Sequence, residues 1–266
     1  MAVGDVPKGV EPEDRPEKPG EVARLASLGL PRAGAWLLPA PIPALGLHIP
    51  SKEFIIMAKY RLGCKVYAEE GPCPACHHPS DVFGDHALSC GHWGERITRH
   101  NSIRDQVHNM AATAMLNPVK EGRFILPGCD RRPADVYLPN WAAGRDAALD
   151  TTVINPLQQA TLEGAAREPG YALDFACQRK IVAEECERQG VAFLPLAFES
   201  LGGWHSTAEK EVAKIAQAMA RQTGREENEC TSHARSRISL LLMRGNASIL
   251  LNRVPCPANP ATDGDL

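Results

Sequence analysis

The sequence lacks the features that mark membrane-spanning, secreted and strongly basic proteins. No run approaches the ~18 consecutive apolar residues of a membrane-spanning helix, and no basic stretch near the start leads into an apolar one, so we expect neither a membrane segment nor a secretory signal. The formal net charge of −3 excludes a surface that is cationic throughout. Any contact with nucleic acid must therefore be local.

The sequence also lacks the pattern of a disulfide framework. Its nine cysteines are an odd number, and three of them fall in one short window that also contains histidine. This usage favours metal binding in a reducing, intracellular compartment. The 266 residues, 44% hydrophobic and 23% charged, suffice for one α/β core with appendages or for two small domains.

Changes in composition divide the chain into four parts. Residues 1–23 are rich in Pro, Gly, Glu and Asp, which predicts disorder. Residues 24–48 carry prolines among leucines, which predicts an irregular segment. We therefore expect a disordered or irregular leader at 1–51, a helix (52–60) and a Cys- and His-rich knuckle within 52–95, a regular core at 96–225, and a C-terminal helical segment and tail at 226–266.

Within the core, apolar spacing predicts helices and strands in alternation. Apolar residues three and four apart indicate an amphipathic helix, and Ser206 with Glu209 forms a capping box ahead of another. The expected order is a helix with Ile103, Val107, Met110 and Ala114 on one face, strands 124–127, 134–138 and 147–154, helix 171–189, strand 191–198, and the capped helix. This order favours an α/β fold, a short mixed sheet flanked by helices, over a bundle or a sandwich.

The cysteine window has the spacing of a zinc site. Cys73-x2-Cys76 is followed after nine residues by His86-x3-Cys90. Two cysteines in a tight turn can hold one tetrahedral ion, and a helical turn places residues four apart on one face. A Cys₃His set completes the shell, which predicts structural Zn²⁺. The alternatives are that these are free cysteines, or that His77, His78 or His92 replaces a ligand.

Four charged residues along the core predict a second metal site. Glu121 precedes the first strand, Asp135 enters the second, Asp150 lies inside the third, and Lys180 is on the next helix. An unpaired carboxylate inside an apolar strand is costly, so Asp150 needs a partner, and Mg²⁺ shared with Asp135 would supply one. The ion would activate water against a phosphate, and Lys180 would stabilise the developing charge.

Each of these residues also has an ordinary structural explanation. Asp135 can pair with Arg131 or Arg132, Asp150 can be held by backbone donors or by Thr152, and Lys180 can be a solvated helix lysine. Their order along the chain carries the prediction.

Several stretches together resemble the C-terminal region of non-LTR retrotransposon proteins. They are 84–90 (GDHALSC), 98–101 (TRHN), 132–136 (RPADV), 178–180 (QRK), 194–200 (LPLAFES) and 203–204 (GW), and 60–63 (YRLG) is similar to the end of the polymerase region. In that family a reverse transcriptase is followed by a Cys-Cys-His-Cys knuckle and a restriction-like endonuclease of the PD-(D/E)xK superfamily. The resemblance covers roughly residues 52–222.

The resemblance implies a Mg²⁺-dependent endonuclease that nicks DNA, with Asp135 and Asp150 as metal ligands, Lys180 as catalytic lysine and Glu121 as an auxiliary acid. The sequence departs from the motif where Ala134 separates the proline from the aspartate, and where Thr152 stands in place of the usual lysine. It also holds no stretch long enough for a polymerase, so a separately encoded reverse transcriptase is an expected partner.

Basic residues near the acids predict the nucleic-acid contacts. We expect DNA, with RNA as the alternative, to contact Arg99, Arg131, Arg132 and Arg179 in a nuclear protein. A second basic run at 235–253 is expected to be the solvated face of a closing helix. The competing functions are a catalytically inactive nucleic-acid-binding remnant of a retroelement and a zinc-stabilised interaction protein.

Overall fold

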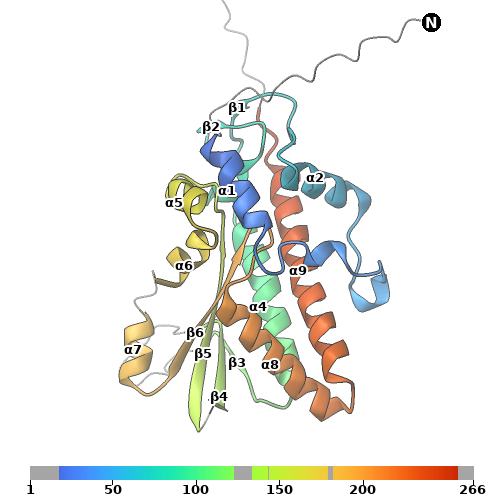
Figure 1. The fold of residues 1–266 in the computed structure, drawn as a ribbon, viewed down its shortest axis with the longest axis vertical. Helices are drawn as coiled ribbons and strands as arrows, with labels where there is room; N and C mark the ends of the chain where they lie inside the picture. Colours follow the sequence, from blue (N-terminus) through green and yellow to red (C-terminus); the bar gives the residue numbers. More distant parts are fainter. Residues whose placement is uncertain (1–17, 123–133, 143, 179–181, 257–266) are drawn as a thin grey trace, which may run out of the picture.

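The structure is a computed structural model that describes residues 18–122, 134–142, 144–178 and 182–256 (Figure 1). Its main sheet has the strand order β3-β4-β5-β6. The strands are β3 (Val119–Lys120), β4 (Val136–Ala142), β5 (Arg145–Ile154) and β6 (Ala192–Glu199). β4 is antiparallel to both β3 and β5, whereas β6 is parallel to β5. The sheet is therefore mixed, as the order of the predicted segments required.

Helices cover both faces of this sheet (Figure 1). α4 (Glu95–Thr113) and α8 (Ser206–Thr223) pack against one face, and α9 (Glu227–Asn252) packs against both helices. The connection from β5 to β6 runs through α5 (Leu162–Arg167), α6 (Tyr171–Gln178) and α7 (Val182–Arg188), of which α6 and α7 cover the other face. The mixed α/β class is thus confirmed.

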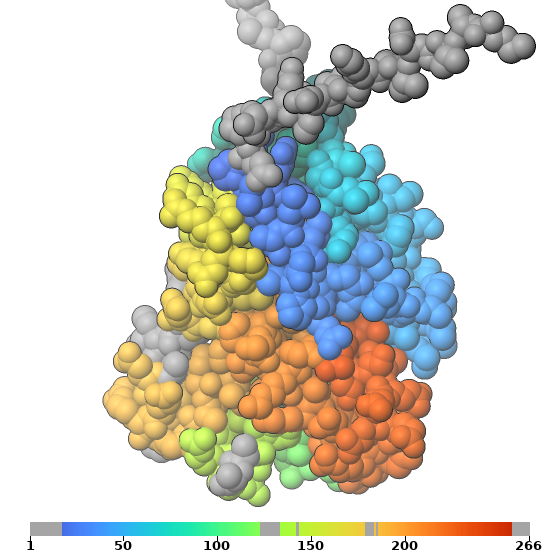
Figure 2. All heavy atoms as spheres, viewed as in Figure 1, coloured from blue at the N-terminus to red at the C-terminus, as the bar shows by residue number. Residues whose placement is uncertain are grey.

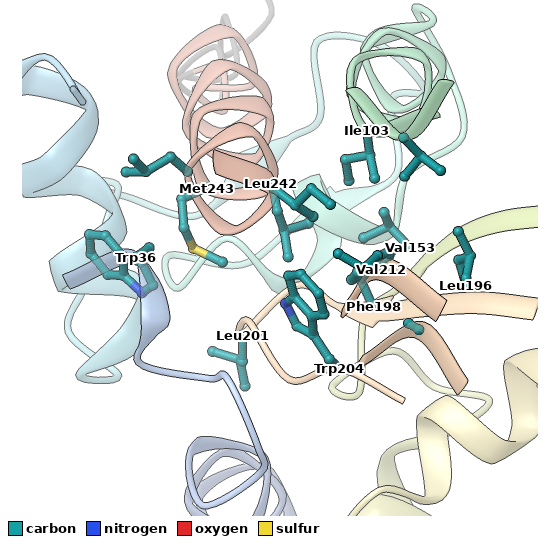
Figure 3. Close-up of a cluster of buried hydrophobic side chains, with 14 of the residues drawn as sticks. Trp36, Ile103, Val153, Leu196, Phe198, Leu201, Trp204, Val212, Leu242 and Met243 are labelled. Atoms are coloured by element: carbon teal, nitrogen blue, oxygen red, sulfur yellow. The ribbon is translucent and has the colours of Figure 1, made fainter. Parts of the chain in front are cut away.

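The main core lies between the sheet and the helices α4, α8 and α9. Figure 3 shows Val153, Leu196 and Phe198 of the strands meeting side chains from all three helices. Phe198 packs edge-on against Trp204, with ring centroids 5.0 Å apart. The apolar residues that predicted the α4 helix, Ile103, Val107, Met110 and Ala114, are all buried. Spacing of three and four therefore identified the buried face correctly.

The first part of the chain is more regular than the sequence predicts. Helix α1 (Pro19–Leu28) precedes two short 3-10 helices, Ala35–Leu37 and Pro43–Leu45, and α2 (Ser51–Arg61), the helix predicted at 52–60. Ala23 and Trp36 are buried in the main core, and α1 packs against α5, where dark blue and yellow atoms meet in Figure 2. The prediction of a leader without regular elements at 18–51 is wrong, because proline lies in the first turn of α1, where it costs no helical hydrogen bond.

Two further predictions about helix ends and surfaces are corrected. The cap of α8 is His205, whose ring accepts a hydrogen bond from the Thr207 N–H, while Glu209 pairs with Arg32 and Arg235 instead of closing a capping box. The arginines of the second basic run contact protein groups: Arg235 with Glu209, Arg237 with the Leu45 carbonyl, Arg244 with Glu53 and Arg253 with Glu95.

Candidate metal centre and acidic cleft

The cysteine window forms a four-ligand cluster. Cys73 and Cys76 lie in the turn of a hairpin made by β1 (Gly71–Pro72) and β2 (Pro79–Ser80), while α3 (Asp85–Ser89) carries His86 and is followed by Cys90. The four ligand atoms all lie within 4.8 Å of one another. The predicted ligand set is therefore confirmed as a cluster that can bind a metal such as zinc.

Local hydrogen bonds hold the two halves of this knuckle in place. The Cys73 N–H donates to the His78 carbonyl, and the His77 N–H donates to the Cys73 carbonyl, which closes the turn around the first two ligands. Asp81 accepts hydrogen bonds from the backbone N–H groups of Phe83, Asp85 and His86 at the start of α3. A carboxylate placed there satisfies donors that a helix start leaves unpaired.

The electrostatics of the cluster suit a soft cation. Burial raises the pKa of the Cys73 thiol, but backbone N–H donors at Ala75 and Cys76, with His86, outweigh this effect and lower it to about 6. The pKa of Cys76 is raised, first by burial and then by the neighbouring thiols. The Cys76 Sγ lies 3.2 Å from His86 Nε2. Sulfur and imidazole ligands in tetrahedral number are typical of Zn²⁺.

The spare histidines stand outside this cluster. His92 Nδ1 is 3.7 Å from Cys90 Sγ, and His78 Nδ1 is 3.1 Å from the Cys76 carbonyl oxygen. Neither they nor His77 belong to the converging set. The cluster therefore consists of the ligands predicted from spacing, and none of the spare histidines replaces one of them.

One buried asparagine joins the knuckle to the sheet. Asn155, directly after β5, is 3% exposed. Its Nδ2 donates to the Asp85 carbonyl and the Ser89 hydroxyl of α3, and its Oδ1 accepts from the hydroxyls of Tyr60 and Ser200. The knuckle therefore packs on the core as part of the same unit, a role that the sequence analysis did not assign to Asn155.

A cleft of about 530 Å³ lies where β5 runs past the start of β4. Its walls include Asp150 to Val153 of β5, Glu121, and the first turns of α4. Leu149 and Val153 face the main core. Ala148 and Ile154 instead belong to two smaller hydrophobic clusters under α7 and α6. Asp150 lies between these apolar neighbours and is only half-buried, because it opens into the cleft.

Asp135 lies beside this cleft and completes the edge of the sheet. Its N–H donates to the Leu149 carbonyl, and its Oδ2 accepts from the Thr151 N–H at 2.6 Å. The carboxylate thus takes the place of a strand carbonyl next to β5. Oδ1 lies 3.1 Å from Nε2 of His100, which lines the cleft. The backbone on both sides of Asp150 is therefore tied to Asp135.

The other cleft acids also contact protein groups. Glu121 pairs with Arg104 of α4, and the Thr152 hydroxyl lies 3.4 Å from Asp150, one of the partners foreseen for that residue. Both acids have further interactions. Among the described residues, no second set of three or more Asp, Glu, His or Cys side chains converges as the knuckle does. The sharing of one ion by Asp135 and Asp150 stays a prediction.

The predicted cations fall into two groups. Lys180, Arg179, Arg131 and Arg132 lie outside the described residues. Arg99 is 3% exposed, donates to Asn246 Oδ1 and lines the cleft, so its contact with nucleic acid stays a prediction. The Arg99 side chain faces inward because α9 covers the side of α4 on which Arg99 lies. The sequence analysis also missed His100, although it follows Arg99 within a stretch that carries the family resemblance.

The chain matches no protein-family model, and none of the curated proteins compared with it is similar enough to count as a relative. In the part of the chain that the structure describes, no helix combines the length and apolar character needed to cross a membrane.

Proposed function

We propose that this chain is a metal-dependent DNA endonuclease of retroelement origin, with a zinc knuckle that is structural. The observation that carries the proposal is Asp150, a carboxylate within an apolar strand that opens into a cleft. Asp135 is bonded to the backbone on either side of it. Partial burial of a charged side chain is costly, and charged side chains that are partly buried in a cleft are typical of functional sites.

The side chains present fit a hard divalent cation. Mg²⁺ needs only one or two protein carboxylates and keeps several waters. Asp150 supplies one carboxylate, and Asp135 keeps acceptor capacity, because each carboxylate oxygen has two lone pairs. When bound there, Mg²⁺ would polarise the scissile phosphate and make a coordinated water more acidic.

The chain's own residues would then position and neutralise charge. The Thr151 N–H and His100 fix the orientation of the Asp135 carboxylate, and Arg104 holds Glu121 at the cleft wall. Lys180 is proposed as the cation that stabilises charge on the phosphate. In this proposal the partners are nuclear DNA and a separately encoded reverse transcriptase.

Plasmid nicking tests the activity. Purified full-length protein should convert supercoiled plasmid to the open circular form with Mg²⁺ and leave it intact with EDTA. Asp150→Ala should reduce nicking to the level of the EDTA reaction. Equal nicking by the wild type and Asp150→Ala would point to a contaminating nuclease and overturn the proposal.

A catalytically inactive nucleic-acid-binding module is the alternative, and one observation favours it. Asp135 and Glu121 each contact protein donors, as acids with purely structural roles would. In that case the protein should bind duplex DNA in EDTA but produce no nicks with Mg²⁺ or Mn²⁺.

A further inference from the structure

Arg99 is a buried cation that no carboxylate of the described residues neutralises. It lies on the second turn of α4 and is 3% exposed. Its Nη1 donates to the Asn246 Oδ1 at 2.6 Å, while its Nε has no hydrogen-bond partner. Throughout the described segments, no carboxylate forms an ion pair with it, whereas the other buried arginines, Arg24, Arg104 and Arg253, each have at least one such partner.

Helix α9 is shaped to hold this side chain. A Cβ at Gly245 would come within 2.5 Å of the Arg99 Cγ, so only glycine lets the arginine pass over α9. The next residue, Asn246, is fully buried and donates through Nδ2 to the Ser200 carbonyl. That bond orients its Oδ1 toward Arg99. The position of the guanidinium is therefore fixed by two consecutive residues of a distant helix.

The position is electrostatically unfavourable for the protein alone. Burial, followed by the charge of Arg96, lowers the pKa of Arg99 to about 9, so it remains cationic at neutral pH. A buried charge paired only with a neutral amide is costly, which makes an incoming anion its natural partner. Arg99 lines the cleft together with Arg96, His100 and Asn101, so an anion in the cleft can reach it.

We propose that Arg99 and Arg96 form a phosphate-binding subsite in the wall of the cleft, and that it takes a phosphodiester of a nucleic-acid backbone. The planar guanidinium matches phosphate geometry better than a point charge does. A cleft of about 530 Å³ is in the size range of sites for ligands much larger than a phosphate ion, which favours a phosphate carried on nucleotides. The proposal rests on the proposed function only in that nucleic acid enters this cleft.

Binding of a fluorescent 20-base-pair duplex in EDTA tests the subsite without cleavage. Arg99→Met should weaken binding by about 10- to 100-fold, and the log–log salt slope should become less steep by ~0.9. Arg99→Lys keeps the positive charge but loses the planar guanidinium. Its affinity for the duplex should therefore lie between those of the wild type and Arg99→Met. Arg24→Met is the matched control, because Arg24 is a buried arginine paired with Asp85 outside the cleft. It should bind the duplex as the wild type does.

Thermal unfolding separates a binding arginine from a structural one. Arg99→Met should raise the Tm in chloride buffer because it removes a buried unpaired charge, whereas Arg24→Met should lower it. Inorganic phosphate at constant ionic strength should raise the Tm of the wild type but not that of Arg99→Met. If Arg99→Met instead lowers the Tm as Arg24→Met does, or prevents folding, Arg99 is a structural arginine and the proposal is overturned.

Two other outcomes are also decisive. If inorganic phosphate stabilises the protein through Arg99 while duplex affinity does not depend on it, the site binds a small phosphate ligand and the nucleic-acid assignment is overturned. If Arg99-dependent duplex binding is found but Mg²⁺ produces no nicks, the subsite stands and the proposed nuclease activity fails.

Discussion

The knuckle and the cleft use acidic and metal-binding residues in different ways. The four knuckle ligands come from one short segment, residues 73–90, and their ligand atoms face one another within 4.8 Å. Of the acids at the cleft, Asp150 lies in β5, Glu121 directly follows β3, and Asp135, beside the cleft, directly precedes β4; each contacts protein groups. The knuckle is a closed set of ligands, whereas the cleft is an open surface with a mixture of charges.

The difference shows what each region requires for folding. Closed Cys and His shells gain their stability from the ion itself. The acids at the cleft already contact Thr151, His100 and Arg104, so we expect the sheet to fold without a cation. We therefore expect metal removal to change the fold of the knuckle, and at the cleft to affect only the proposed nicking activity.

Loss of the knuckle ligands should have the largest effect. Purified wild type should contain about one Zn²⁺ per chain, and Cys73→Ser with Cys76→Ser should contain none, because two of four ligands are lost. Limited proteolysis should then cut within the knuckle. The control, Cys64→Ser with Cys256→Ser, changes two exposed cysteines outside the cluster and should keep the zinc. Freshly reduced wild type without zinc by mass spectrometry would rule out a zinc knuckle.

Substitution of Asp135 should reveal its two roles. Asp135→Ala should abolish nicking and also lower the free energy of unfolding by about 1–3 kcal/mol, because the Thr151 N–H loses its charged acceptor. Chemical denaturation and the plasmid assay measure the two effects separately. Asp135→Asn keeps an acceptor for Thr151, so it should recover stability without activity. An active Asp135→Asn would remove this residue from the proposed metal site.

Lys180 and Arg179 should differ in kind. Lys180→Ala should lower nicking at least ~100-fold, the scale of losing one electrostatic donor, with zinc content unchanged. Arg179 is expected to contact the DNA backbone and not the reacting phosphate, so Arg179→Ala should act on DNA affinity and its salt dependence. Single-turnover nicking and duplex binding in EDTA measure both. If Arg179→Ala is inactive and Lys180→Ala is not, the catalytic cation was assigned to the wrong residue.

Features that depend on local spacing could be predicted from the sequence, and those that depend on distant contacts could not. The knuckle ligands and the buried face of α4 follow from residues a few positions apart, and both predictions are confirmed. The burial of Arg99 depends on Gly245 of α9, and the contact of His100 with Asp135 depends on how α4 meets β5. The order of helices and strands in the core predicted a mixed sheet. That this sheet belongs to a restriction-like endonuclease fold stays a proposal.

Glu199 sharpens the comparison, because it is a buried acid that belongs to neither region. It ends β6 and is 1% exposed, and burial raises its pKa to about 7 against the effect of the Ser27 hydroxyl. The native carboxyl holds a proton that the unfolded chain loses near its ordinary value of 4.5. Its contribution to stability is therefore lost as pH rises toward 7.

Glu199→Gln should accordingly be more stable than the wild type above about pH 7, by about 3 kcal/mol, and nearly equal to it near pH 5. Denaturation at a series of pH values measures the difference. Its nicking activity should be unchanged, because Glu199 does not line the cleft in the described structure. A difference in stability that does not vary with pH would show that Glu199 is ionised in the native protein.

Asn155 provides the smallest and most specific test, because it connects the two regions. Its amide holds α3 of the knuckle against the end of β5, the strand that carries Asp150. Asn155→Ala should lower the free energy of unfolding by about 1–3 kcal/mol, since it leaves buried partners unpaired. Zinc content should not change, because none of the four ligands contacts Asn155 through a hydrogen bond. If zinc is lost together with stability, the knuckle depends on the core, and the contrast between a self-sufficient knuckle and a supported cleft is wrong.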